Sequence, residues 1–152
     1  MLETLDKALD EYSIGDKFIT SRRTVTETDL VLFAGLSGDY NPLHIDAVYA
    51  EGTQFGQRIA HGTLVLALVT GPTFRLSGSG KQNLALAGID GIRFLKPVFI
   101  GDTIHVEGEI VDIVPKDENR GLLTRREDIY NQRGEKVATY LKTAFVRRTR
   151  VD

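Results

Sequence analysis

The sequence contains no cysteine among its 152 residues. This absence excludes disulfides, thiolate nucleophiles and cysteine-based metal sites. Long apolar runs are also missing, because the longest, residues 64–69, is far shorter than the roughly 20 residues needed to span a bilayer. The first twelve residues, MLETLDKALDEY, alternate acids with leucines and lack the basic start and apolar centre of a signal peptide. We therefore expect a cytoplasmic protein with no membrane partner.

The chain has no excess of basic charge. It carries 19 Lys and Arg against 21 Asp and Glu, a net charge of −2. Duplex binding needs a clustered basic surface, so nucleic acid is not an expected partner. The basic run 147–150 is interpreted as a solvated tail. The length and the 41% hydrophobic content predict one domain, residues 1–152, with a single core.

Helical patterns dominate the first half of the chain. Apolar residues at helical spacing predict a short amphipathic helix over residues 2–12, and residues 17–25 are predicted to form one strand. Thr26 followed by Asp29 is a capping-box pattern, which predicts a helix that runs toward Gly38. Pro42 is expected to interrupt any helix through the next polar loop, and residues 45–50 to form a short helix.

Residues 63–76 have helical length but are apolar on every side, which indicates a buried helix. Gly71-Pro72 is expected to kink or end it. Alternating or β-branched segments separated by turn residues predict four strands after it. These are residues 84–94, 103–114, 121–131 and 136–148.

An antiparallel sheet must cover its apolar face, and only the helix over residues 63–76 is apolar enough to do so. The prediction is an α+β fold, a five-stranded antiparallel sheet wrapped around one central helix. Such a sheet leaves open edges, which proteins commonly protect by pairing with another chain, so we also predict a homodimer.

Residues 33–66 contain more polar residues and glycines than the packing of a fold requires. Asp39 and His44 bracket a loop stiffened by Pro42, and a carboxylate held near an imidazole can share one water with it for acid–base chemistry. On spacing alone, a turn-capping Asp39 and a packed His44 explain the pattern better. Asn41 is expected to bind the loop backbone. A metal bound by His44 and Asp46 lacks a third ligand at suitable spacing, so no metal is expected.

Gly62 precedes the apolar helix, where backbone N–H groups are unpaired and the helix dipole is positive. Glycine lets a substrate oxygen approach closely, and a donor aimed at an oxyanion contributes about 3 kcal/mol to transition-state stabilisation. A glycine required only for packing fits the sequence equally well. His61 is predicted to cap the helix or to pack. Tyr40 and Phe55 are candidate pocket walls, although core packing also explains them, and His105 receives no functional role.

The segments FAGLSGDYNPLH (33–44), FG (55–56), IAHG (59–62) and RFLKPVFIGDT (93–103) resemble the MaoC-like (R)-specific enoyl-CoA hydratase and dehydratase family. The resemblance extends from about residue 14 to residue 148. It implies a hotdog fold and a homodimer whose sheets join edge to edge, with an acyl-CoA bound near the interface. It also implies roles for seven residues. Asp39 and His44 match the catalytic pair, Gly62 the residue whose N–H binds the thioester oxygen, and Tyr40, Asn41, His61 and Thr70 positions that support the site or bind substrate.

The implied reaction is the reversible hydration of a trans-2-enoyl-CoA to an (R)-3-hydroxyacyl-CoA. It needs no metal or redox cofactor, and coenzyme A is part of the substrate. Two alternatives stay open. A hotdog thioesterase would need a carboxylate on or beside the central helix, but residues 64–76 contain none. A non-catalytic acyl-CoA-binding subunit would have no chemical need for Asp39, Asn41 and His44 together.

The sequence leaves the acyl chain open, and also whether the carrier is CoA or acyl carrier protein. Arg58, Arg93 and Lys96 are guesses for phosphate-binding residues.

Overall fold

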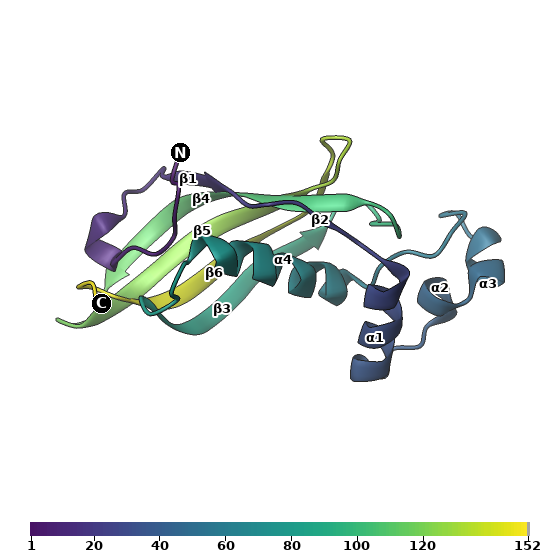
Figure 1. Cartoon of the computed structure of the whole chain (residues 1–152), viewed down its shortest axis with the longest axis horizontal. Coiled ribbons are helices and arrows are strands. Elements are labelled where there is room, and N and C mark those ends of the chain that lie inside the picture. The colour runs from purple at the N-terminus through teal and green to yellow at the C-terminus, as the bar shows by residue number, and fades with distance from the viewer. Residues whose placement is uncertain (152) are drawn as a thin grey trace.

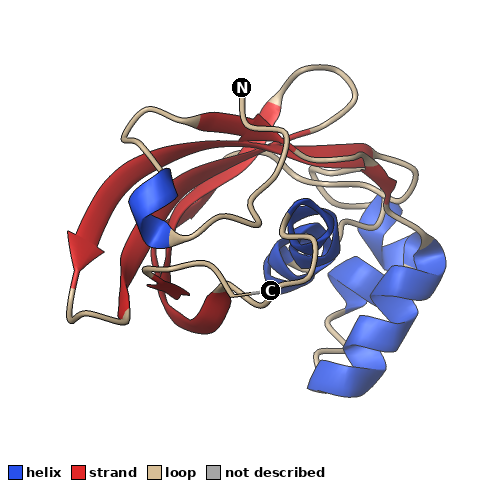
Figure 2. Ribbon diagram, turned by 60° about the vertical axis from the view of Figure 1, so that its left-hand side comes forward, coloured by secondary structure: helices blue, strands red, loops and turns tan. Residues whose placement is uncertain are grey.

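The computed structural model describes residues 1–151 and shows a strongly curved antiparallel sheet that cups one long helix (Figures 1 and 2). The order of the strands is β1-β4-β5-β6-β3, and β2 also pairs with β4. The predicted α+β architecture, a sheet around a central helix, is confirmed. The strands are β1 (Lys17–Ile19), β2 (Arg23–Thr24), β3 (Asn83–Phe94), β4 (Thr103–Pro115), β5 (Arg120–Tyr130) and β6 (Lys136–Arg147).

The sheet has six strands instead of five, because the strand predicted over residues 17–25 is split in two. Thr20 lies at the break. Its N–H donates to the Val106 carbonyl at 2.9 Å, and its side-chain hydroxyl accepts the Val106 N–H at 2.9 Å. A hydroxyl therefore takes the place of a backbone carbonyl in the ladder, and regular pairing stops there.

The central helix, α4, spans Gly62–Leu76. It runs on through Pro72, so the interruption expected at Gly71-Pro72 does not end it. Its buried face and the concave side of the sheet form one apolar core. Helix residues in that core are Leu64, Val65, Leu68 and Val69, and sheet residues include Val106, Ile110, Leu123, Ile129 and Ala138.

Residues 2–12 do not form the predicted helix, and only a short 3₁₀ turn, η1 (Leu9–Glu11), is present. Tertiary hydrogen bonds take the backbone groups that a helix would use. The Leu5 N–H donates to the Leu76 carbonyl at 2.7 Å, and the Leu2 N–H to the Lys17 carbonyl at 2.6 Å. The apolar positions are buried even so, which is why the sequence pattern resembled that of a helix.

Three helices project beyond one end of the sheet (Figure 1). Helix α1 (Glu27–Ser37) begins at the predicted capping box of Thr26 and Asp29, which is confirmed by both reciprocal hydrogen bonds. No helix continues from α1 through Pro42, as expected, although a short helix, α2 (Pro42–Ile45), begins at that proline. Proline is well tolerated at a first helical position, where its missing N–H would have had no partner. Helix α3 (Ala47–Glu51) corresponds to the short helix predicted over residues 45–50.

No helix within residues 1–151 is both long enough and apolar enough to cross a membrane.

Four polar side chains lie in register on β5 and β6, where Arg125 pairs with Lys142 and Glu127 with Tyr140. Arg125 and Glu127 are 6% and 0% exposed, and an Arg125 nitrogen lies 2.9 Å from Glu127 Oε1. The Tyr140 hydroxyl donates to Glu127 Oε2 at 2.5 Å. Lys142 has no carboxylate within ion-pair distance among residues 1–151, and burial lowers its pKa. The group therefore contains one cation more than it has carboxylates.

We predict opposite effects from removing the two cations. Lys142→Met should raise the free energy of unfolding at neutral pH by about 1 kcal/mol, because it removes an unpaired, half-buried charge. Arg125→Met should lower it by about 3 kcal/mol or more, because Glu127 would keep a buried charge without its partner. Urea unfolding of both variants at pH 7 provides the measurement.

A pH series supplies the control for Lys142. Its pKa is lowered in the folded protein, so the unfolded chain binds more protons between that value and 10.5. Lys142 should therefore make the free energy of unfolding of the parent protein rise as pH increases through that window. This contribution to the rise should be absent in Lys142→Met. An identical slope in both proteins would contradict the assignment.

Candidate active site

The polar loop after α1 folds back on itself through short side-chain-to-backbone bonds. The Asp39 N–H donates to Ser37 Oγ at 3.1 Å, and Asp39 Oδ1 accepts the Asn41 N–H at 3.2 Å. Asn41 Oδ1 in turn accepts the Leu43 N–H at 3.0 Å and caps α2. The expectation that Asn41 binds loop backbone is confirmed. These bonds fix the backbone between Asp39 and His44.

His44 projects from α2 toward the segment that precedes α4. Its Nδ1 lies 2.7 Å from the Ile59 carbonyl oxygen. A carbonyl can only accept, so Nδ1 donates the hydrogen, and in the neutral ring Nε2 keeps a lone pair. The loop thus presents an imidazole of fixed tautomer beside a carboxylate.

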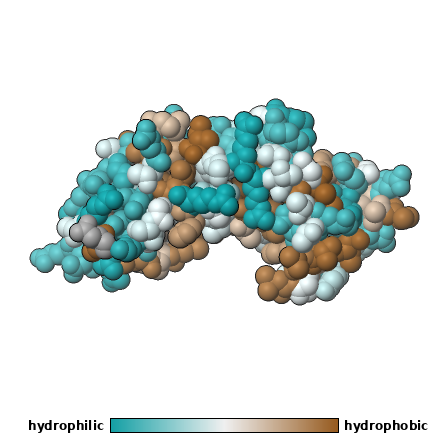
Figure 3. Space-filling view, viewed as in Figure 1, coloured by the Kyte–Doolittle hydropathy of each residue, from teal (hydrophilic) through white to brown (hydrophobic). Residues whose placement is uncertain are grey.

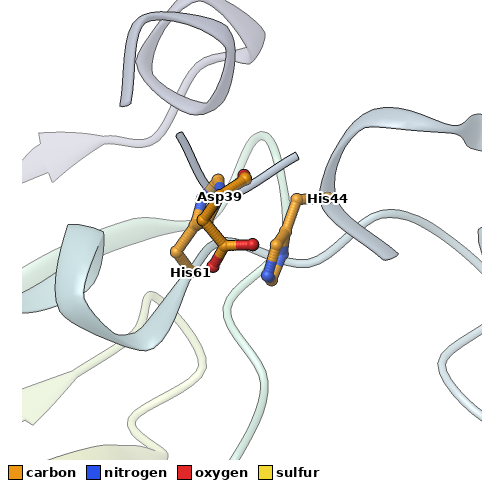
Figure 4. Close-up of side chains that lie close together, drawn as sticks. All are labelled: Asp39, His44 and His61. Atoms are coloured by element: carbon orange, nitrogen blue, oxygen red, sulfur yellow. The ribbon is translucent and has the colours of Figure 1, made fainter. Parts of the chain in front are cut away.

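His61 joins this pair, and the three side chains lie close together in Figure 4. Asp39, His44 and His61 each offer one polar side-chain atom, and these atoms lie within 4.8 Å of one another. The His44 and His61 rings stack, with centroids 3.8 Å apart and an interplanar angle of 28°. The structure therefore brings Asp39 and His44 together, as predicted, and places His61, a predicted supporting residue, directly against them.

A cavity of about 390 Å³ opens beside His44 and the start of α4. Its wall is mainly apolar. The lining includes His44, Phe55, Ile59, Gly62, Val65, Phe94, Leu95, Pro97, Val98 and Val137.

Gly62 is the first residue of α4, so its N–H has no acceptor within the helix. A Cβ at this position would lie 2.8 Å from Cζ of Phe94, which is closer than such contacts occur. The Phe94 ring therefore occupies the space that a side chain at residue 62 would need, and this packing requires a glycine.

Two predicted supporting residues lie away from the cavity. Tyr40 is 57% exposed and is not part of its wall, although Phe55 is. Thr70 lies eight residues beyond Gly62, about 12 Å along the helix axis, and its hydroxyl donates to the Leu66 carbonyl at 3.3 Å. Thr70 lines a different cavity, beside Lys142, and its implied supporting role stays a prediction.

The three candidate phosphate-binding residues differ in their surroundings. Arg58 pairs with Glu27 at 2.7 Å, and Arg93 donates to the Ile92 carbonyl at 2.8 Å. Lys96 pairs with Glu135 at 2.6 Å and also lines the cavity of His44. Lys96 is therefore the only one of the three that borders the candidate site in the described part of the chain.

Asp102, which directly precedes β4, supports the cavity wall, and it was assigned no role from the sequence. It is 4% exposed, and its carboxylate accepts hydrogen bonds from the Phe99 N–H, the Gln132 amide and Arg133. Burial raises the pKa of Asp102, but these three donors outweigh it and hold the pKa below its usual value. Through the Phe99 N–H, this buried carboxylate fixes the end of the segment that contributes Leu95 to Val98 to the cavity wall.

Comparisons with known proteins identify the family. Residues 10–130 match the model of the MaoC-like domain, and this chain belongs to that family. An (R)-specific enoyl-CoA hydratase of Aeromonas caviae is 32% identical over 127 residues, which cover 83% of this chain and 89% of the relative. An (R)-specific enoyl-CoA hydratase of Rhodospirillum rubrum is 39% identical over 95 residues, or 62% of this chain and 63% of the relative. Protein MaoC of Klebsiella aerogenes is 38% identical over 100 residues, or 66% of this chain.

The chain spans only part of some relatives, since the matched region is 29% of protein MaoC and 63% of the Rhodospirillum hydratase. Among solved structures, a monoamine oxidase regulatory protein from Archaeoglobus is 40% identical with a TM-score of 0.89, covering 99% of this chain and all of that one. A Mycobacterium tuberculosis protein described as a double hotdog fold aligns with a TM-score of 0.78 at 20% identity, over 94% of this chain and 44% of that one. That alignment supports the fold alone, which is the hotdog fold expected from the sequence.

Proposed function

We propose that this protein catalyses the reversible hydration of a trans-2-enoyl-CoA to an (R)-3-hydroxyacyl-CoA. The observation that carries the proposal is the meeting of Asp39, His44 and the start of α4 beside one mainly apolar cavity. Relatives named as hydratases and dehydratases of acyl-CoA thioesters support the reaction class.

Conjugation with the thioester carbonyl makes Cβ of the enoyl group electrophilic. Asp39 and His44 would hold one water, take a proton from it as its oxygen bonds to Cβ, and return a proton to Cα on the same face. Both groups contact the same water in this proposal, so we assign neither as the sole acid nor the sole base. Dehydration uses the same groups in reverse.

Negative charge develops on the thioester oxygen as Cβ is attacked. The Gly62 N–H at the start of α4 is the proposed donor to that oxygen, aided by the positive end of the helix dipole. The Phe94 ring packs where a Cβ at Gly62 would lie, so the glycine lets this ring and the helix start meet at the cavity wall.

We further propose that the reaction uses no metal or redox cofactor. A metal ion bound by an imidazole lies in the ring plane about 2.0–2.1 Å from the nitrogen. The His44 and His61 rings are stacked and nearly parallel, so their lone pairs lie in separate planes. One ion cannot meet both lone pairs in plane, which argues against a site that uses both histidines with Asp39.

A homodimer joined along β3 is the proposed assembly. Strand β3 is at one edge of the sheet and exposes Leu84, Leu86 and Ile89. On the projecting helix α1, Leu32 and Leu36 are also exposed, and Figure 3 shows apolar side chains gathered at that end. A second copy pairing with β3 would remove the open edge and cover apolar surface. The cytoplasm is the proposed location.

Replacing either member of the pair should abolish most activity. We expect Asp39→Asn and His44→Ala each to lower kcat for hydration of trans-2-butenoyl-CoA by at least about a hundredfold, the range for general acid–base groups. His105→Gln, a histidine on β4 outside the cavity, is the matched control and should retain normal kcat. Loss of the enoyl absorbance gives the rate, and chiral analysis should give the (R) product.

Near-normal turnover by a folded Asp39 or His44 variant would refute the proposal, and release of free thiol would indicate a thioesterase.

The oxyanion role is tested with two glycines of the same helix. Gly62→Ala should lower kcat/KM by about tenfold or more, because its methyl group would overlap the Phe94 ring and disturb the cavity wall beside a donor worth about 10²–10³ in rate. Gly71→Ala should leave kcat/KM unchanged, since a Cβ there meets nothing within 4 Å. Equal kinetics for both variants would remove Gly62 from the mechanism.

The assembly is tested by mass in solution. The parent protein should show twice its chain mass of 16.9 kDa by light scattering, whereas Leu86→Lys should shift toward the single chain, because a charge on an edge strand opposes pairing. Ile14→Lys, at a 68% exposed position far from β3 in sequence, should stay dimeric. A monomeric parent protein would contradict the dimer.

A further inference from the structure

His61 is the last residue before α4, and its ring is 2% exposed. A residue at this position commonly caps the helix through its side chain, but His61 makes no capping bond. Its Nε2 instead lies 3.0 Å from the main-chain carbonyl oxygen of Asp39, 22 residues away in sequence. The carbonyl can only accept, so Nε2–H donates to it.

The same ring makes two further contacts. One face stacks on the His44 ring at a centroid distance of 3.8 Å, and Phe33 of α1 packs edge-on at 4.9 Å. The second nitrogen of His61, Nδ1, is buried and has no hydrogen-bond partner in the described residues. A buried polar atom without a partner costs about 1–3 kcal/mol, so an apolar ring would suit this site better if packing were its only purpose.

His44 is otherwise held by a single hydrogen bond, from Nδ1 to the Ile59 carbonyl. A single hydrogen bond tolerates a range of angles, so it leaves the ring some freedom to tilt about its Cβ–Cγ bond. Stacking on His61 removes this freedom, because a ring that turned would lose its flat contact. His61 therefore restrains the main chain of Asp39 and the ring plane of His44 together.

We propose that His61 is a positioning residue that holds the Asp39–His44 pair in register with the start of α4. It is bonded in sequence to Gly62, so the one ring links the two water-holding groups to the proposed oxyanion donor. This inference rests on the proposed hydration activity. Its physical basis is that the attacking water must reach Cβ while the thioester oxygen meets the Gly62 N–H, and a misplacement of about 1 Å costs on the order of a hundredfold in rate.

Two variants separate the two contacts of the ring. His61→Phe keeps a flat ring for stacking but removes the donor to Asp39. His61→Gln keeps an N–H near the position of Nε2 but removes the ring. For each we expect kcat for trans-2-butenoyl-CoA hydration to fall about 10- to 100-fold per folded protein while KM changes less than about threefold, because geometry is lost and substrate binding is kept. His105→Gln is again the control with unchanged kinetics.

A double-mutant cycle tests whether His61 acts through the pair. Adding His61→Gln to His44→Ala should cause little further loss in kcat, since the group being positioned is already gone. Losses that multiply in full would show that His61 acts independently of His44 and would overturn the proposal. Unchanged kcat in both His61 single variants would overturn it as well.

The outcomes also separate this inference from the proposed function. Wild-type kcat for the His61 variants beside inactive Asp39→Asn and His44→Ala would reject only the positioning role. Wild-type kcat in all four variants would reject the hydratase mechanism itself. Thermal melts and kinetics below the lowest melting temperature keep a folding defect from being read as lost catalysis, and an unchanged kcat per folded protein beside a lowered melting temperature would assign His61 a structural role.

Discussion

The position of α4 inside the curved sheet is the constraint on which the site depends. Its buried leucines and valines each contribute about 1.5–3 kcal/mol by leaving water. A helix held by so many apolar contacts cannot slide along its axis without exposing them. Its first residue, Gly62, therefore has a fixed position in the fold, and the polar loop must approach the helix start at that position.

That meeting is made by hydrogen bonds and not by apolar packing. The loop between α1 and α2 is mostly exposed, so it has little apolar burial to hold it. The loop and α2 are tied to the segment before α4 by two side-chain bonds, from His44 to the Ile59 carbonyl and from His61 to the Asp39 carbonyl. The Ile59 N–H also donates to the Leu43 carbonyl at 3.3 Å. Hydrogen bonds have directions, whereas apolar contacts do not, and directional bonds are what a pair of proton-transferring groups requires. The sheet and helix hold the start of α4 in place, and the loop carries the groups that are proposed to transfer protons.

Much of the fold could be predicted because it follows from local patterns. The capping box of Thr26 and Asp29, the apolar helix and the long strands each have a sequence signature within a dozen residues. The wrong secondary-structure predictions share a cause, because hydrogen bonds to residues far away in the sequence determine the local structure there. Leu5 forms no helix because its N–H bonds to Leu76, and the strand predicted over residues 17–25 breaks because Thr20 bonds to Val106 through its hydroxyl.

The same limit applies to the site. Asp39, Asn41 and His44 belong to one loop, and their proximity followed from a short spacing and the resemblance. The contact between His61 and Asp39 joins two elements, and no periodicity or motif spacing predicts a stacked ring. Thr70 likewise shows what a motif leaves out, since its distance from Gly62 along the helix places it beside another cavity.

Two polar clusters border α4, and their hydrogen-bonding states differ. Glu127 is fully buried; its Oε2 accepts the Tyr140 hydroxyl, and Arg125 lies 2.9 Å from Oε1, which accepts no hydrogen bond within residues 1–151. At the other end, Asp39 is exposed, and His44 borders a cavity with Nε2 free of any partner among residues 1–151. A carboxylate oxygen of Asp39 and the His44 Nε2 can both accept hydrogen bonds, and water is the smallest molecule that can donate to both groups. The second cluster therefore has the hydrogen-bonding requirements of a site that binds and activates water.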